Sequence, residues 1–173
     1  MRIIIDHDLK LRPYNIKDKT SLYKNSTDPL FLKYMEFTKF SVKKFNDWLI
    51  KKTKSKDTIF FVIEYKKKPI GTYILNISGI KKQICDLSYG IYRQYHGMGI
   101  FKRVTKKILE KFKRLKRFKR FSAITRKDNL PSIKGLKRLK FKEEGILKSY
   151  YYDLKTKKYY DALILSYISS KNK

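Results

Sequence analysis

The stretch from Ile84 to Leu115 limits the possible folds of this 173-residue chain more than any other part of its sequence. Its first part, Ile84–Tyr92, predicts a strand. A glycine-containing segment, Gln94-x-x-Gly97-x-Gly99, separates this strand from a region in which apolar residues recur every three or four positions. One apolar stripe of this kind predicts an amphipathic helix from about Gly97 to Leu115. The residues of the stripe are Phe101, Val104, Ile108, Phe112 and Leu115.

The order of strand, glycine turn and helix is suited to binding a phosphate group. The first N–H groups of a helix have no partner within the helix and lie at the positive end of its dipole. Gly97 and Gly99 carry no side chains, so an anion can approach these N–H groups closely. A Walker A loop is excluded because Ile100 and Phe101 stand where it needs Lys and Ser or Thr. A dinucleotide fingerprint is excluded because its third glycine would fall at Lys102.

The segment Gln94–Gly99, called the glycine turn below, resembles motif A of the GNAT acetyltransferase superfamily, Gln/Arg-x-x-Gly-x-Gly/Ala. Its flanks, Leu87–Ile91 and Gly97–Ile100, are similar to the branch that contains the ribosomal-protein N-terminal acetyltransferases of the RimJ/RimL type. A second stretch, Asn129–Phe141, resembles motif B of the same superfamily, which reads Asn-x-x-Ser/Ala and then Phe after eight further residues. The interval between the two motifs also matches the family.

Each motif has a purely structural explanation as well. A glycine turn can join any strand to any helix. In the second motif, Asn129 suits the N-cap of a helix and Pro131 suits its first turn, which is a sufficient reason for both residues. Because the two motifs occur together and at the family's interval, we favour the family resemblance over two unrelated structural features.

The rest of the sequence predicts a mixed α/β sheet. Thr58–Tyr65 and Ile70–Leu75 predict an antiparallel hairpin, and Ser41 suits the N-cap of a helix. The aromatic residues between Phe31 and Phe40 either shape an acceptor cleft or pack in the core. The resemblance implies one GNAT-like α/β domain over residues 1–173, with a mostly antiparallel sheet whose central strands diverge between flanking helices. We expect its core at 9–168 and a frayed tail at 169–173. Other expected elements are strands at Leu9–Tyr14, Phe121–Ile124, Leu147–Leu154 and Tyr159–Tyr167, a short helix at Asp18–Lys24 and a loop at Thr125–Asp128.

Length and composition agree with one globular domain that is long enough to bury a core. No run of about eighteen apolar residues is present, so no membrane span is expected. Met1–Asp8 contains too short an apolar segment for a signal peptide. Cys85 is the only cysteine and cannot form an internal disulfide, which fits the reducing cytoplasm that we expect as the location.

The formal net charge of +29 is extreme for a chain of this length. It suggests a polyanionic partner such as nucleic acid, the ribosome, an anionic membrane or a phosphorylated substrate. An AT-rich genome would produce the same excess of Lys, Ile, Tyr and Phe, and alanine occurs only at Ala123 and Ala162. Both explanations stay open, and a non-catalytic basic module that binds nucleic acid or the ribosome is the competing functional class.

The family resemblance implies that an acetyl group moves from acetyl-CoA, the cosubstrate, to a primary amine. It implies direct attack by the neutral amine, with no covalent enzyme intermediate and no metal. It also implies that the backbone of Ile91–Arg93 aligns pantetheine and that the glycine turn holds the pyrophosphate. The residues expected to bind acetyl-CoA are Ile91, Tyr92, Arg93, Gln94, Tyr95, His96, Gly97, Met98, Gly99, Ile100, Phe101, Asn129 and Ser132.

Candidates for the catalytic base and acid are few. Asp86, on the strand before the glycine turn, is the best-placed acidic residue for a general base, with Glu64 and Asp161 behind it. Tyr150 and Tyr152 are the candidate acids, and strand alternation predicts that both lie on one face. For each of the three carboxylates we favour a structural or solvent-facing role over base chemistry.

The acceptor is best predicted from proton chemistry. Many members of the family have a proton-donating Tyr where this chain has Leu136. Near pH 7.5 a lysine amine of pKa about 10.4 is only about 0.1% neutral, whereas an α-amine of pKa about 7.8 is about one third neutral. Because the chain offers few candidate catalytic acids and bases, we expect an acceptor amine of low pKa, either a protein N-terminus or a small-molecule amine such as an amino sugar. The charge favours an acceptor on an anionic carrier, such as a nucleotide-linked amino sugar or ribosome-bound protein. A monomer and a homodimer are both compatible with the sequence.

Overall fold

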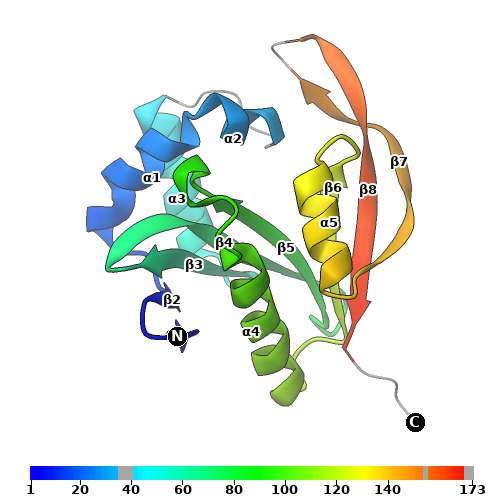
Figure 1. Ribbon diagram of the computed structural model, residues 1–173, viewed down its shortest axis with the longest axis horizontal. Helices are drawn as coiled ribbons and strands as arrows, with labels where there is room; N and C mark the ends of the chain where they lie inside the picture. The colour runs from blue at the N-terminus through cyan, green and yellow to red at the C-terminus, as the bar shows by residue number, and fades with distance from the viewer. Residues whose placement is uncertain (35–40, 154–155, 170–173) are drawn as a thin grey trace.

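A computed structural model describes residues 1–34, 41–153 and 156–169 of the chain. In this described part an eight-stranded sheet carries α4 and α5 on the side that faces the viewer in Figure 1, with α1, α2 and α3 grouped near β3 and β4. None of the described helices is long and apolar enough to cross a membrane. The strands are β1 (Ile3–Ile4), β2 (Leu9–Arg12), β3 (Thr58–Tyr65), β4 (Lys68–Ser78), β5 (Ile84–Ile91), β6 (Arg120–Arg126), β7 (Lys142–Asp153) and β8 (Lys158–Ile168). The helices are α1 (Lys19–Ser26), α2 (Pro29–Tyr34), α3 (Val42–Lys54), α4 (Ile100–Arg114) and α5 (Leu130–Arg138), with short 3₁₀ turns η1 (Ile16–Asp18) and η2 (Arg93–Tyr95).

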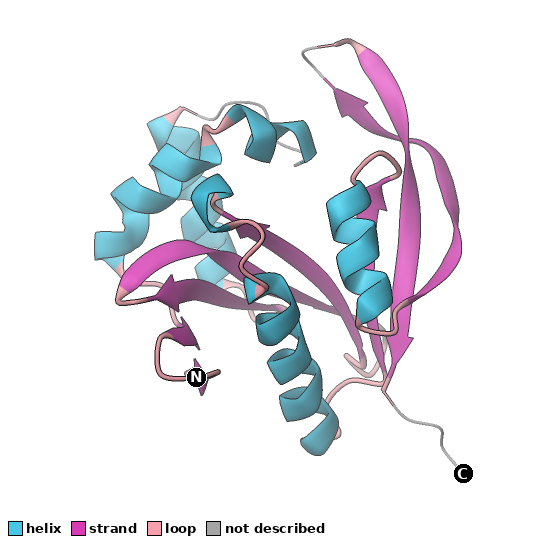
Figure 2. Ribbon diagram, in the orientation of Figure 1, coloured by secondary structure: helices cyan, strands magenta, loops and turns pink. Residues whose placement is uncertain are grey.

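The sheet has the order β1-β2-β3-β4-β5-β6-β8-β7. Strands β5 and β6 pair in parallel, and all other pairs are antiparallel. The parallel pairing joins only Ile84–Asp86 to Arg120–Ser122, and beyond it the two strands diverge (Figure 2). The predicted mixed sheet with a central divergence is therefore confirmed. From Leu87 to Ile91, β5 pairs with β4 alone among the described strands. The backbone groups on its other edge therefore face the gap between β5 and β6, called the opening below.

Helix α4 begins later than the sequence predicted. Gly97 and Gly99 adopt left-handed backbone angles, with φ of 78° and 68°, so they form a turn and the helix starts at Ile100. Val104, Ile108 and Phe112 of the predicted stripe are buried against the sheet. Leu115 lies at the C-cap with 55% of its surface exposed, so it does not belong to the buried stripe.

Strands β4, β6, β7 and β8 extend beyond their predicted limits. The loop expected at Thr125–Asp128 is wrong for its first two residues, because Thr125 and Arg126 pair with β8 and are buried. Strand β7 begins at Lys142, before the predicted start at Leu147. Ser169 is buried and donates a backbone hydrogen bond to the Lys119 carbonyl (2.8 Å), while residues 170–173 of the expected tail lie outside the described residues.

Aromatic packing fixes α4 and α5 against the diverging strands. The ring of Tyr89 on β5 lies 5.8 Å from that of Tyr73 and 4.3 Å from that of Phe101, measured between centroids. The buried hydroxyl of Tyr73 is paired with Thr105 Oγ1 (3.1 Å), which avoids the cost of an unpaired polar group. A Cβ on Gly135 would lie 2.9 Å from the Phe101 ring, so the absence of a side chain lets α5 approach α4 closely. This packing positions both helices beside the opening.

Candidate functional site

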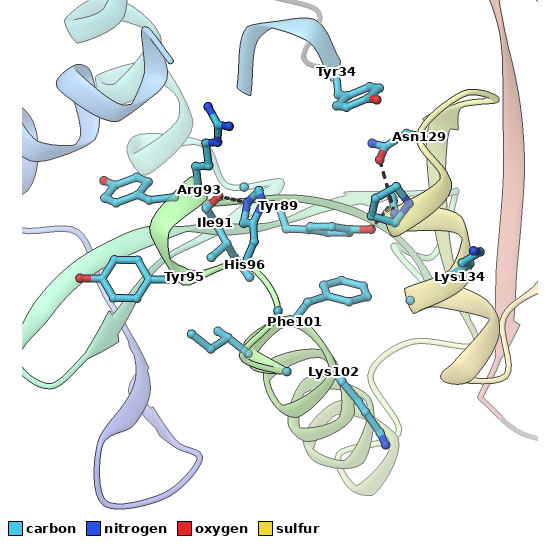
Figure 3. A pocket seen from close by; sticks show the side chains of 18 of the residues that line it. Tyr34, Tyr89, Ile91, Arg93, Tyr95, His96, Phe101, Lys102, Asn129 and Lys134 are labelled. Atoms are coloured by element: carbon cyan, nitrogen blue, oxygen red, sulfur yellow. Dashed lines mark hydrogen bonds between the residues drawn. The ribbon is translucent and has the colours of Figure 1, made fainter. Parts of the chain in front are cut away.

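A cavity of about 700 Å³ lies where β5 and β6 diverge. Its walls come from α1 and α2, the end of β5, the glycine turn, the start of α4 and the first turns of α5 (Figure 3). All the residues that the sequence predicted to bind acetyl-CoA line this cavity, except Gln94 and Met98 of the glycine turn. Two segments separated by about thirty residues, the glycine turn and Asn129–Ser132, therefore meet at one site.

The glycine turn presents backbone N–H groups to open space. The first hydrogen bond of α4 runs from Arg103 N to the Gly99 carbonyl (3.1 Å). The N–H groups of Ile100, Phe101 and Lys102 come before it in the chain and have no acceptor within the helix. A Cβ on Gly97 or on Gly99 would meet no atom within 4 Å. The space in front of the turn is thus open to a ligand, and the helix dipole favours an anion there.

Positive side chains surround the cavity. Lys102 projects from α4 and Lys134 lies on α5, and both line the cavity (Figure 3). Arg138 adds a third cation, and Arg93 lies toward the upper end. Among the described lining residues the only carboxylate is Asp28. This charge distribution suits a ligand with several phosphate groups.

The wall between β5 and α5 contains a hydroxyl pair. Tyr89 Oη and Ser132 Oγ are 2.6 Å apart, and Asn129 Oδ1 accepts a hydrogen bond from Ser132 N at 3.4 Å as the N-cap of α5. Burial raises the pKa of Tyr89 to about 12, and the hydrogen bond with Ser132 only partly offsets this rise. Tyr89 therefore keeps its proton at neutral pH. Sequence reasoning missed Tyr89 as a site residue, although it lies within the flank Leu87–Ile91 that resembles the family.

The upper end of the cavity is formed by residues that no motif indicated. Tyr34 lies at the end of α2, across the opening from Asn129, and Asn25 and Asp28 lie nearby in sequence (Figure 3). Of the aromatic residues expected to shape an acceptor cleft, Tyr34 lines the cavity, whereas Phe37 and Phe40 lie outside the described residues.

His96 of the glycine turn folds back onto the end of β5. Its Nε2 atom lies 2.8 Å from the carbonyl oxygen of Ile91 and donates this hydrogen bond, because a carbonyl oxygen can only accept (Figure 3). His96 therefore contacts the backbone segment at which the family resemblance places pantetheine.

The residues predicted to be catalytic lie outside the lining of the cavity. Asp86 is located where β5 and β6 still pair, and its carboxylate accepts hydrogen bonds from Ser122 Oγ and, at 3.4 Å, from Ser78 Oγ. Tyr150 and Tyr152 lie on β7 with 45% and 47% of their surfaces exposed. A catalytic role for these three residues stays a prediction.

The other candidates from the sequence have structural partners. Glu64 is held by Lys10 Nζ at 2.6 Å and by Arg12, which together outweigh the effect of burial and lower its pKa. Asp161 accepts hydrogen bonds from Ser149 N (3.0 Å) and Lys148 Nζ (3.2 Å), and these lower its pKa. Cys85 is fully buried, and burial raises the pKa of its thiol, so it is not an activated nucleophile.

Comparison with known proteins connects this geometry to a family. Residues 8–142 match the family described as Acetyltransferase (GNAT) domain. A relative named Uncharacterized N-acetyltransferase p20, from Bacillus licheniformis, is 25% identical in an alignment of 158 residues that covers 87% of this chain and 88% of the relative.

Two solved structures share the fold at low sequence identity. The Microcin C7 self immunity acetyltransferase MccE, in complex with acetyl-CoA and AMP, has a TM-score of 0.83 at 20% identity and covers 95% of this chain and 94% of its own. RimL, a ribosomal L7/L12 alpha-N-protein acetyltransferase, has a TM-score of 0.87 at 17% identity and covers 97% of this chain and 94% of its own. The family match includes the glycine turn, Asn129 and Ser132. The chain therefore belongs to the GNAT acetyltransferase family, as an acetyl-CoA-dependent N-acetyltransferase.

Proposed function

We propose that this enzyme acetylates a primary amine of low pKa, either a protein N-terminus or an amino sugar. The observation that carries the proposal is the charge of the cavity, where four cations face a single described carboxylate. Such a cavity repels polyamines and protonated lysine side chains. An α-amine, by contrast, is about one third neutral near pH 7.5 and needs no strong base. The cations are Arg93, Lys102, Lys134 and Arg138, and the carboxylate is Asp28.

The cavity fits acetyl-CoA, which supplies the acetyl thioester when bound. The open space in front of Gly97 and Gly99 admits a phosphate group to the N–H groups at the start of α4. Lys102 and Lys134 line the same cavity and add positive charge to it. The edge of β5 at Leu87–Ile91 that has no strand partner among the described residues offers backbone groups to an amide-containing chain such as pantetheine, in the manner of an added strand.

We assign the delivery of a proton to the leaving thiolate to Ser132, with Tyr89 behind it. The two hydroxyls are 2.6 Å apart in the cavity wall, and both keep their protons at neutral pH. Ser132 Oγ donates its proton to the sulfur and receives another from Tyr89 Oη, and the proton that the acetylated amine loses returns through solvent to Tyr89, so the step ends with a thiol, an amide and both hydroxyls protonated. Leu136, which replaces the proton-donating Tyr of many family members, is fully buried and has no proton to donate.

An anionic carrier for the acceptor agrees with the charge of the whole chain. A net charge of +29 attracts nucleotide-linked amino sugars and ribosome-bound protein. The related MccE was solved with AMP, and RimL is named for a ribosomal protein substrate, which supports both kinds of acceptor as candidates.

The proposal is tested by turnover of three amines at saturating acetyl-CoA: a tripeptide with N-terminal serine, glucosamine and spermidine. We expect the peptide or the amino sugar to give the highest kcat/KM. Preferred turnover of spermidine would contradict the proposal, because that substrate is a multiple cation.

The same assay decides between the two sets of catalytic candidates. Ser132→Ala and Tyr89→Phe are expected to lower kcat by about a hundredfold, the usual size of a lost general-acid contribution. Activity lost instead in Asp86→Asn, Tyr150→Phe or Tyr152→Phe would support the assignment made from the sequence.

A further inference from the structure

Arg126, the last residue of β6, joins three separate parts of the chain. It is 4% exposed. Its Nη1 donates hydrogen bonds to the carbonyl oxygen of Lys33 (3.0 Å) and to Asp153 Oδ2 (3.3 Å). Its Nε and Nη2 donate to the two carboxylate oxygens of Asp128, at 2.9 and 2.8 Å. One guanidinium group therefore connects α2, the loop after β6 and the end of β7.

Aromatic rings complete the surroundings of this guanidinium. The centre of the group lies 3.6 Å from the centroid of the Tyr160 ring on β8 and 5.7 Å from that of Tyr34 on α2. In Figure 1, α2 and the β7–β8 hairpin lie on the two sides of the opening above the diverging strands. Arg126 thus spans this opening at its upper end.

The hydrogen bond from Arg126 to the Lys33 carbonyl anchors α2, a helix too short to be stable by itself. Helix α2 has six residues, too few to be stable alone in water. Lys33 lies in its last turn, where carbonyl groups have no partner within the helix, and a cation is favourable at this end of the dipole. The donor comes from a residue 93 positions away in sequence, so the bond is a tertiary contact. The next residue, Tyr34, lines the cavity.

We propose that Arg126 is a positioning residue for the acceptor: it anchors α2 across the opening and so holds Tyr34 in the cavity wall. The acceptor part of this inference rests on the proposed function. The cosubstrate end of the cavity is built by α4 and α5, and the four side-chain hydrogen bonds of Arg126 go to neither helix. Its backbone carbonyl accepts a hydrogen bond from Asn129 N (2.9 Å), the N-cap of α5, and a side-chain substitution leaves that bond in place. Loss of the anchor should therefore weaken use of the amine and spare the binding of acetyl-CoA.

Arg120 provides a matched control on the same strand. It lies at the opposite end of β6 and forms a bidentate ion pair with Glu144. Its Nη1 donates to Oε1 (2.8 Å) and its Nη2 donates to Oε2. It does not line the cavity. A purely structural ion pair at Arg126 would make the variants Arg126→Gln and Arg120→Gln behave alike.

The experiment combines three measurements on the full chain: hydrogen exchange, the KM for the amine and the Kd for acetyl-CoA. Exchange is followed at the α2 amides, including Leu32 N, which donates to the Asp28 carbonyl (2.9 Å). In Arg126→Gln we expect about tenfold faster α2 exchange, the effect of one lost buried hydrogen bond. The KM for the serine tripeptide or glucosamine should rise about tenfold, while the Kd for acetyl-CoA changes less than about twofold. Arg126→Lys keeps the charge and should recover part of both losses, and Arg120→Gln should alter neither.

Each contrary result overturns a stated part of the inference. Unchanged α2 exchange in both Arg126 variants would refute the anchor. Faster exchange with an unchanged KM would refute the positioning role. Equal effects in Arg120→Gln, or acetyl-CoA affinity lost in proportion to turnover, would mean general destabilisation. If Arg126→Gln does not fold, Arg126→Lys decides both questions. If the wild type acetylates neither amine, the proposed function fails, and α2 exchange still decides the anchor.

Discussion

Single glycines make the anion site possible. Gly99 has φ of 68° and a Cβ there would meet no atom within 4 Å, so a substitution causes backbone strain without a clash. We expect Gly99→Ala to cost about 1 kcal/mol of stability, the usual penalty for a left-handed residue with a side chain. The methyl group would also occupy the space in front of the N–H groups. Acetyl-CoA affinity should therefore fall about tenfold, as for loss of one charged hydrogen bond, in a calorimetric titration.

Gly79 is the matched control for this substitution. It lies in the turn between β4 and β5, outside the cavity, and has φ of 86°. The atoms nearest to a Cβ at this position would belong to the flexible side chain of Gln83, the first at 3.0 Å. Gly79→Ala should lose similar stability in urea unfolding and bind acetyl-CoA as the wild type does. Equal loss of affinity in both variants would show that the glycine turn acts through stability alone.

Tyrosine ionisation makes stability depend on alkaline pH. Burial raises the pKa of Tyr89 and of Tyr92 to about 12, compared with about 10 in the unfolded chain. A pKa that is higher in the folded state means that the stabilisation is complete below pH 10 and is lost as pH rises from about 10 to about 12. Each shift corresponds to about 2–3 kcal/mol.

Lysines titrate in the same range, so the informative quantity is the difference between wild type and Tyr89→Phe. We expect the free energy of unfolding of Tyr89→Phe to fall less steeply between about pH 10 and 12, since phenylalanine has no hydroxyl to ionise. Urea unfolding at a series of pH values measures this difference. Parallel profiles for the two proteins would contradict a raised pKa at Tyr89.

At the scale of elements, substitutions at two helix N-caps distinguish an effect on stability from an effect on acetyl-CoA binding. Ser41 Oγ accepts a hydrogen bond from Lys44 N at 3.2 Å at the start of α3, and Asn129 caps α5 in the same way at 3.4 Å. Replacing either cap by Ala should cost about 1 kcal/mol in urea unfolding. Only Asn129→Ala should also weaken acetyl-CoA binding, because α5 carries Ser132 and Lys134 into the cavity wall. An equal loss of affinity in Ser41→Ala would contradict this separation.

The elements show which features the sequence could predict. Apolar periodicity located the buried face of α4, but the start of the helix depends on the left-handed angles of Gly97 and Gly99, which periodicity does not describe. Strand β6 was predicted too short because Thr125 and Arg126 are polar. They are buried only through pairing with β8 and through contacts with distant residues.

The candidate site divides in the same way. The glycine turn, Asn129 and Ser132 follow local patterns, and the structure brings them together in one cavity. Tyr34 reaches this cavity because α2 folds across the opening, and the anchor of α2 is Arg126, 93 positions from Lys33. No local pattern in the sequence encodes a contact of that kind.

The charge of the whole molecule should govern how fast acetyl-CoA arrives. A net charge of +29 creates a long-range field that accelerates the encounter with a multiply charged anion. Salt screens this field over about 10 Å at 0.1 M. In stopped-flow measurements we expect the association rate constant to fall about tenfold or more from low to high salt, with a smaller change in the dissociation rate constant.

Substitutions of two lysines on α4 distinguish the effect of this long-range field from that of a direct contact with bound acetyl-CoA. Lys102 lines the cavity, whereas Lys113 is exposed near the other end of the same helix and outside the cavity. Lys102→Gln and Lys113→Gln remove the same charge, so both should slow association by a similar, small factor. Only Lys102→Gln should speed dissociation of acetyl-CoA, because a contact that persists in the complex acts on that rate. Faster dissociation in both variants would mean that the field, rather than the lysine in the cavity wall, holds the bound cosubstrate.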